Sequence, residues 1–156
     1  MPALKTGIIS ALRGCCSTAA QFSACNNRAV KAASLIALAG AVGTLARWGL
    51  SAAVYARLGE GFPWGTLAVN VLGCFIFGVV MQAWATNALG DTTRALVCIG
   101  FLGAFTTFST FSYDTVAKLQ EGQWLVAGGN VLGSVAAGLL AVWAGIALAR
   151  VIWGAA

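Results

Sequence analysis

Residues 100–112 read GFLGAFTTFSTFS and lie in the middle of a long apolar stretch. Residues 106–112 contain five serines and threonines, which is more than hydrogen bonding of hydroxyl groups to the preceding helical turn would explain. With Gly100 and Gly103 just before them, these residues indicate a helix that breaks and exposes carbonyl oxygens. Such oxygens need a partner, which is either another chain or a cation.

This stretch belongs to the third of four segments that are long enough to cross the hydrocarbon of a bilayer. We place the four segments at residues 32–54, 64–86, 95–117 and 124–149. Of the 156 residues, 60% are apolar and only 8% are charged, so water is not the main solvent of the chain. We therefore expect an all-α integral membrane protein of four transmembrane helices, with one multi-pass domain at residues 32–156.

Residues 1–31 differ from the rest because they hold four basic residues and no acidic one. Arg13 interrupts their short apolar piece, which argues against a signal peptide. We interpret them as a poorly ordered N-terminal extension, while a transit-like segment and an upstream start codon stay open. Near the membrane, one side has four basic residues and the other has three. The orientation of the chain across the membrane is therefore weakly specified, unless Lys5 and Arg13 decide it.

Composition excludes several classes of function. The chain has no histidine, and its five cysteines show no metal-ligand spacing, which argues against zinc sites and histidine-based catalysis. No acidic residue lies deep within a segment, which argues against proton-coupled transport. The net charge of +5 fits membrane topology rather than nucleic-acid binding, because no nucleic-acid motif is present. Without a nucleophile and base pair or a nucleotide motif, no enzyme is expected.

Two amides, Asn70 and Asn130, lie within apolar segments, and Ser134 follows Asn130 by one helical turn. Neutral amide and hydroxyl donors, like the positive rim of a phenylalanine ring, suit an anion. Hydrogen bonding between helices is equally open for both amides. For the many glycines, including Gly129 and Gly133 in GxxxG spacing, plain helix packing is the better interpretation.

The chain contains three further patterns: Gly-x-x-Gly-x-x-x-Arg at residues 40–47, Asn-x-x-Gly-x-Phe-x-x-Gly at 70–78 and Gly-Ala-Phe-Thr-Thr-Phe-Ser-Thr-Phe at 103–111. They resemble the motifs of the Fluc/CrcB fluoride channel family, and the third is the most specific. The similarity covers about residues 33–150. Two positions depart from the family pattern: Ala104 stands where a second glycine is commoner, and Asn130 stands where tyrosine is common.

The resemblance implies a fluoride-selective channel of the cell (inner) membrane, through which cytoplasmic fluoride leaves passively and fluoride toxicity falls. It implies an antiparallel homodimer in lipid, with the third helix of each subunit broken at mid-membrane. A structural Na⁺ at the dimer centre would be held by backbone carbonyls at Gly103 and Thr106, and Arg47 would lie near a vestibule. The residues implied for the fluoride pathway are Asn70, Phe108, Phe111, Ser109, Thr110, Asn130 and Ser134.

Two other classes of membrane protein compete with a channel. Small four-helix multidrug exporters have a similar size, but they resemble one another in a glutamate of the first span, and residues 32–54 contain no acid. A membrane scaffold subunit would explain the glycine-rich packing but leaves the hydroxyl cluster of residues 106–112 unexplained. Ion flux through liposomes separates a channel from a scaffold.

Deleting residues 1–30 should leave fluoride flux intact, because this segment lacks apolar periodicity and lies outside the family similarity. The measurement is fluoride efflux from liposomes that contain the truncated protein, compared with the full chain at equal protein density. Loss of efflux from a truncated protein that inserts normally would refute the prediction.

Overall fold

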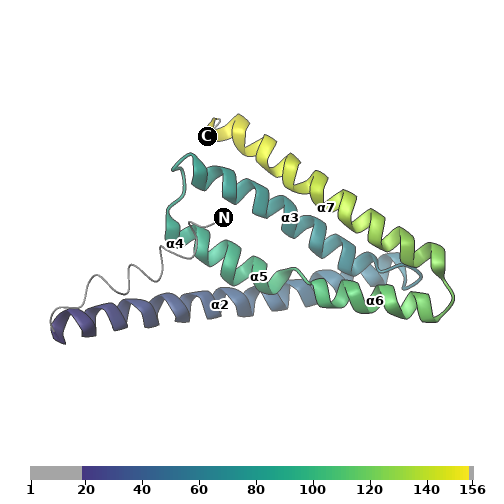
Figure 1. The fold of residues 1–156 in the computed structure, drawn as a ribbon, viewed down its shortest axis with the longest axis horizontal. Helices are drawn as coiled ribbons and strands as arrows, with labels where there is room; N and C mark the ends of the chain where they lie inside the picture. Colours follow the sequence, from purple (N-terminus) through teal and green to yellow (C-terminus); the bar gives the residue numbers. More distant parts are fainter. Residues whose placement is uncertain (1–18, 155–156) are drawn as a thin grey trace. The chain divides into compact units, whose positions relative to one another are not determined.

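The computed structural model describes residues 19–154, so residues 1–18 of the expected N-terminal extension lie outside its description. The chain divides into two units, residues 1–35 and 36–156. Every element of the described part is helical (Figure 1). In chain order the elements are α2 (Ala19–Leu58), α3 (Trp64–Ala85), α4 (Asp91–Arg94), the π-helical segment η1 (Ala95–Phe101), α5 (Leu102–Phe105), α6 (Phe108–Gln120) and α7 (Trp124–Trp153).

Four helical stretches are long and apolar enough to cross a membrane, as the sequence predicted. They are Ala29–Leu58, Trp64–Ala85, Asp91–Gln120 and Trp124–Trp153. The first, third and fourth are longer than expected, and the second ends one residue earlier than expected. Helix α2 begins well before residue 32, at Ala19. Residues 19–31 of the expected extension are therefore helical.

The connection between α3 and α4 begins with a tight cap at Asn87. This residue has a φ of 59°, and the N–H of Ala88 donates to the carbonyl oxygen of Ala83 at 2.9 Å, as in a Schellman motif. Gly90, the glycine of this connection, lies beyond the turn and has an ordinary φ of −79°. Asparagine can replace glycine here because its short side chain tolerates the left-handed conformation. Gly122, with a φ of 73°, closes α6.

Helices α3 and α7 lie side by side, and glycines let their backbones approach closely (Figure 1). A Cβ atom added to Gly78 would overlap the carbonyl oxygen of Val142, and one added to Gly145 would overlap that of Phe75. In contrast, a Cβ atom added to Gly133 would meet no described atom within 4 Å. The contact between α3 and α7 therefore depends on glycines other than the second member of the GxxxG pair.

A small apolar core lies where α3 meets α5. Val69, Leu102 and Phe105 are buried there, and the rings of Phe101 and Phe105 stack with centroids 5.3 Å apart. Many other large apolar side chains are exposed, which hydrocarbon tolerates because lipid tails are as apolar as leucine. This core thus adjoins the start of the motif at residues 103–111.

Candidate functional site

The backbone between α5 and α6 leaves the helical conformation at two threonines. Thr106 has φ and ψ of −79° and 156°, and Thr107 has −147° and 117°, so both residues are extended. Helix α5 ends at Phe105, and α6 begins at Phe108. These two residues therefore place the ends of two helices next to each other.

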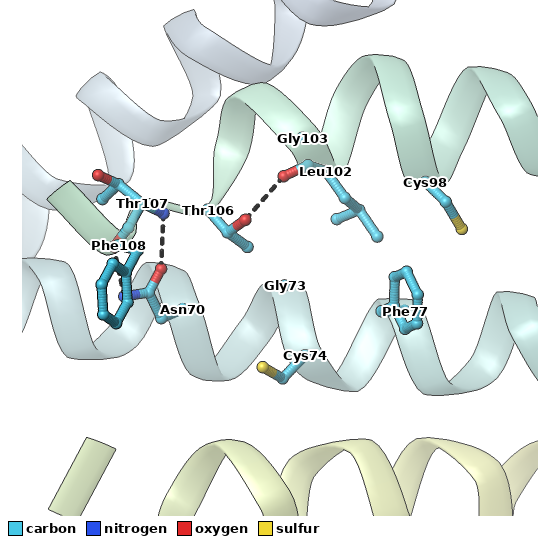
Figure 2. A pocket seen from close by; sticks show the side chains of 10 residues that line it. All are labelled: Asn70, Gly73, Cys74, Phe77, Cys98, Leu102, Gly103, Thr106, Thr107 and Phe108. Carbon is cyan, nitrogen blue, oxygen red and sulfur yellow. Dashed lines mark hydrogen bonds between the residues drawn. The ribbon is translucent and has the colours of Figure 1, made fainter. Parts of the chain in front are cut away.

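The side chain of Asn70 on α3 forms hydrogen bonds with both backbone groups of Thr107, its N–H and its carbonyl oxygen (Figure 2). The N–H of Thr107 donates to Asn70 Oδ1 at 2.8 Å, and Asn70 Nδ2 donates to the carbonyl oxygen of Thr107 at 3.0 Å. In a continuous helix, the N–H of Thr107 would donate to the carbonyl of Gly103. Asn70 takes this donor, so the Gly103 carbonyl loses its helical partner. We call this pair of hydrogen bonds the Asn70–Thr107 clamp.

The hydroxyl groups of residues 106–112 fall into two groups. Thr106 Oγ1 donates to the carbonyl of Leu102 at 2.9 Å, and Ser112 Oγ donates to that of Phe108 at 2.9 Å, which is ordinary back-bonding. The other three hydroxyls, those of Thr107, Ser109 and Thr110, gather at the start of α6. Back-bonding thus explains only part of the cluster, as the sequence indicated.

Thr107 acts as the N-cap of α6. Its Oγ1 accepts from the N–H of Thr110 at 3.1 Å and lies 3.0 Å from Thr110 Oγ1 and 3.2 Å from Ser109 Oγ. Thr107 is only 8% exposed, whereas Ser109 and Thr110 are exposed. Thr107 was not among the site residues expected from the sequence, although threonine just before a helix is a known N-cap signal.

A groove of about 330 Å³ opens beside the break (Figure 2). It brings together four residues that the family resemblance singled out, and its other walls include Gly73, Phe77 and two cysteines. Polar atoms are few in this lining. The four expected residues are Asn70, Gly103, Thr106 and Phe108.

Phe108 and Phe111 lie one turn apart at the start of α6. Their ring centroids are 5.6 Å apart, and the rings are tilted by 41°. Phe108 is 78% exposed and lines the groove, while Phe111 is half-buried. Most of the Phe108 side chain is therefore accessible in the described part of the chain.

Asn130 and Ser134 do not line this groove and belong to the contact between α6 and α7. Asn130 is fully buried, and its Nδ2 donates to Thr115 Oγ1 at 2.8 Å. Ser134 Oγ donates to Asn130 Oδ1 at 3.3 Å, and Thr115 Oγ1 donates to the carbonyl of Phe111 at 2.8 Å. The hydrogen bonding between helices that the sequence left open for Asn130 is confirmed. The sequence did not predict a role for Thr115, because one more hydroxyl residue in a segment that already contains many gives no distinct signal.

Two further polar side chains lie apart from the groove. Arg47 is half-buried on α2 and is not among the groove's lining residues. Thr66 on α3 is 3% exposed, and its Oγ1 donates to Asp114 Oδ2 at 2.8 Å. Asp114 lies near the end of the segment expected at residues 95–117. A buried threonine opposite an acid is visible only after α3 and α6 are placed together.

Comparison with known proteins agrees with the motifs. A family model described as "CrcB-like protein, Camphor Resistance (CrcB)" matches residues 34–146. The chain is 53% identical over 116 residues to a protein of Geobacter sulfurreducens named fluoride-specific ion channel FluC, a match that covers 74% of this chain and 94% of the relative.

Two more relatives carry the same name. The protein of Solidesulfovibrio magneticus is 50% identical over 118 residues, or 75% of this chain and 94% of the relative. The protein of Magnetococcus marinus is 48% identical over 118 residues, or 75% of this chain and 96% of the relative. With the family model matching most of its length, the chain belongs to the CrcB-like family.

Proposed function

We propose that this chain is a passive fluoride channel of the inner membrane and not an enzyme. The observation that carries the proposal is its 48–53% identity to proteins named fluoride-specific ion channel FluC, matched over 94–96% of their length. Neutral HF crosses the bilayer, ionises at the higher cytoplasmic pH and leaves the anion trapped. A channel then lets fluoride leave down its gradient and needs no other energy source.

The third membrane span, in this proposal, is the stretch Asp91–Gln120, broken at mid-membrane. What supports the break is the extended backbone of Thr106 and Thr107, which lie near the centre of that stretch. Backbone that leaves the helix at membrane depth is tolerated where protein or a cavity satisfies it. The Asn70–Thr107 clamp supplies such satisfaction from within the subunit.

The ion path that we infer runs past Asn70, Phe108 and Phe111. Asn70 gives one amide hydrogen to Thr107 and keeps a second one for an anion. The exposed edge of Phe108 offers a weakly positive rim, and Phe111 lies next to it. Weak contacts of this kind suit conduction, because an ion that is held too tightly does not leave.

Hydroxyl and amide groups further along α6 and α7 would continue this path. The exposed hydroxyls of Ser109 and Thr110 can rotate toward an anion, although they already contact Thr107. Asn130 and Ser134 are engaged with Thr115 and with each other, so fluoride contact there requires those bonds to rearrange. We place Arg47 near the vestibule, where its charge would attract anions.

The break also suits a structural sodium ion. In a continuous helix, the carbonyls of Gly103 and Thr106 would accept from the N–H groups of Thr107 and Thr110. Those two N–H groups donate instead to Asn70 Oδ1 and Thr107 Oγ1, which leaves carbonyl oxygens for a hard cation. In the part of the chain that is described, no group of three or more His, Cys, Asp or Glu residues could hold a metal. Main-chain oxygens are therefore the ligands that we propose for Na⁺.

Two copies would pair in opposite orientations around a two-fold axis. Support comes from the weak charge bias, four basic residues against three, which lets a chain insert both ways. A second copy would place its own break against the groove lined by Asn70, Gly103 and Thr106. Sodium would then lie between two sets of carbonyls.

Purified protein in liposomes should release trapped fluoride without any added energy source. The readout is a fluoride-selective electrode, with potassium fluoride inside and a potassium ionophore to remove the opposing voltage. Release of fluoride but not chloride supports the proposal. A scaffold subunit would release neither ion, and that result would end the channel assignment.

Asn70→Leu and Phe108→Ile should each lower fluoride efflux by about tenfold or more while dimers persist in detergent. The first variant removes the amide hydrogens and the second removes the positive ring edge that we propose for the anion. Asn70→Leu also removes the clamp on Thr107, whereas Phe108→Ile keeps most of the apolar bulk. The matched controls are Gln82→Leu, another amide of α3, and Phe77→Ile, a ring on the other wall of the groove. If both site variants conduct like the unmodified protein, Asn70 and Phe108 are packing residues.

Antiparallel pairing should make one loop position accessible from both sides of the membrane. Gln123→Cys, in a background whose five native cysteines are replaced, is exposed between α6 and α7. A membrane-impermeant maleimide added to intact cells should label about half of the molecules, and the rest only after lysis. Labelling of all molecules or none in intact cells, for a protein that conducts fluoride, contradicts the antiparallel model.

A further inference from the structure

Gly73 on α3 lies directly against Thr106 at the break (Figure 2). A Cβ atom added to Gly73 would overlap Cγ2 of Thr106 and would lie 3.4 Å from Cδ1 of Phe105. Gly73 is buried and also lines the groove. The absence of a side chain at residue 73 therefore creates the space that the Thr106 methyl group fills.

The methyl group of Thr106 has little freedom to move out of this space. Thr106 Oγ1 donates to the carbonyl of Leu102 at 2.9 Å, which holds the side-chain rotamer. Its backbone N–H donates to the same carbonyl at 3.0 Å. The next residue, Thr107, is held by Asn70. Moving the methyl group would therefore require either breaking the Thr106 hydroxyl bond or shifting the backbone at the break.

Asn70 and Gly73 are three residues apart on α3 and so face the same direction. One of them binds the backbone at Thr107 and the other receives the side chain of Thr106. Two successive residues of the break are thus located by one turn of a neighbouring helix.

We propose that Gly73 is a positioning residue, which seats Thr106 so that the carbonyls at the break can hold the cation and the ion path stays open. The inference rests on the proposed channel function and on its sodium site. Gly73 touches neither ion in this proposal; it acts through the position of Thr106.

This role is distinct from the helix packing of the other close glycines. Gly78 and Gly145 face backbone atoms of the opposite helix, and no side-chain truncation can make room for a Cβ atom there. Gly73 faces a side-chain methyl group, which Thr106→Ser removes while keeping the hydroxyl. Alanine is also a better helix former than glycine, so helix propensity alone would make Gly73→Ala stabilising. A loss caused by Gly73→Ala therefore reports the collision with Thr106.

The test compares four proteins: unmodified, Gly73→Ala, Thr106→Ser and the double variant. Gly73→Ala should lower fluoride efflux on the order of tenfold, as is typical when a group that orients ion ligands is disturbed. A bound ion stabilises the state that binds it, so the unmodified protein in detergent should unfold at a higher thermal midpoint in sodium than in N-methylglucamine. Gly73→Ala should reduce this difference. Thr106→Ser changes a residue of the proposed sodium site, so it sets the reference for the double variant. The double variant should match Thr106→Ser in efflux and in sodium response, whereas Gly73→Ala should fall below it.

Gly78→Ala is the matched control, because Thr106→Ser should not correct any defect that it causes. If Gly73→Ala does not assemble, recovery of assembly in the double variant supports the inference, and continued failure overturns it. Full efflux and a full sodium shift in Gly73→Ala also overturn it. Absence of efflux from the unmodified protein would instead count against the channel itself, and efflux without a sodium shift would count against the cation site alone.

Discussion

The Asn70–Thr107 clamp is the interaction on which the arrangement around the break depends. Hydrocarbon offers no water to a backbone group that leaves a helix, and each buried polar group left without a partner costs about 1–3 kcal/mol or more. A continuous helix would avoid this cost at Thr107, so a break persists only if something else satisfies its N–H and carbonyl. One amide side chain does both, because asparagine carries a donor and an acceptor side by side. The freed Gly103 carbonyl and the start of α6 at Phe108 both follow from it.

Two identical stretches of sequence have different environments in this fold. Asn-Val-Leu-Gly occurs at residues 70–73 and again at 130–133. In the first, the amide binds a backbone and the glycine lies against a methyl group of the neighbouring helix. In the second, the amide binds the hydroxyl of Thr115, and Gly133 has open space around it. What separates them is the neighbour across the helix interface, which no local pattern specifies.

The sequence was sufficient to predict four membrane-crossing helices, because apolar length and polar connections are properties of consecutive residues. The hydroxyl-rich stretch that the sequence singled out contains the two extended residues Thr106 and Thr107. The sequence did not predict that Asn87 would end α3, that Thr107 would cap α6, or that Thr66 would meet Asp114. The last of these contacts joins residues that are 48 positions apart, and the other two depend on backbone angles that several residue types can adopt.

In the proposed channel, the break would let one short stretch serve ions of opposite charge. At the end of α5 the unpaired groups are carbonyl oxygens, which carry partial negative charge, whereas at the start of α6 they are N–H groups, which carry partial positive charge. Thr107 lies between the two ends, and among backbone N–H groups its side chain accepts a hydrogen bond only from that of Thr110. The partial positive charge of the N–H groups of Phe108 and Ser109 is therefore not offset by this cap. A cation is then favoured on the Gly103 side and an anion on the Phe108 side. Because the two ends are only two residues apart, a cation fixed at the first would also attract the anion that passes the second.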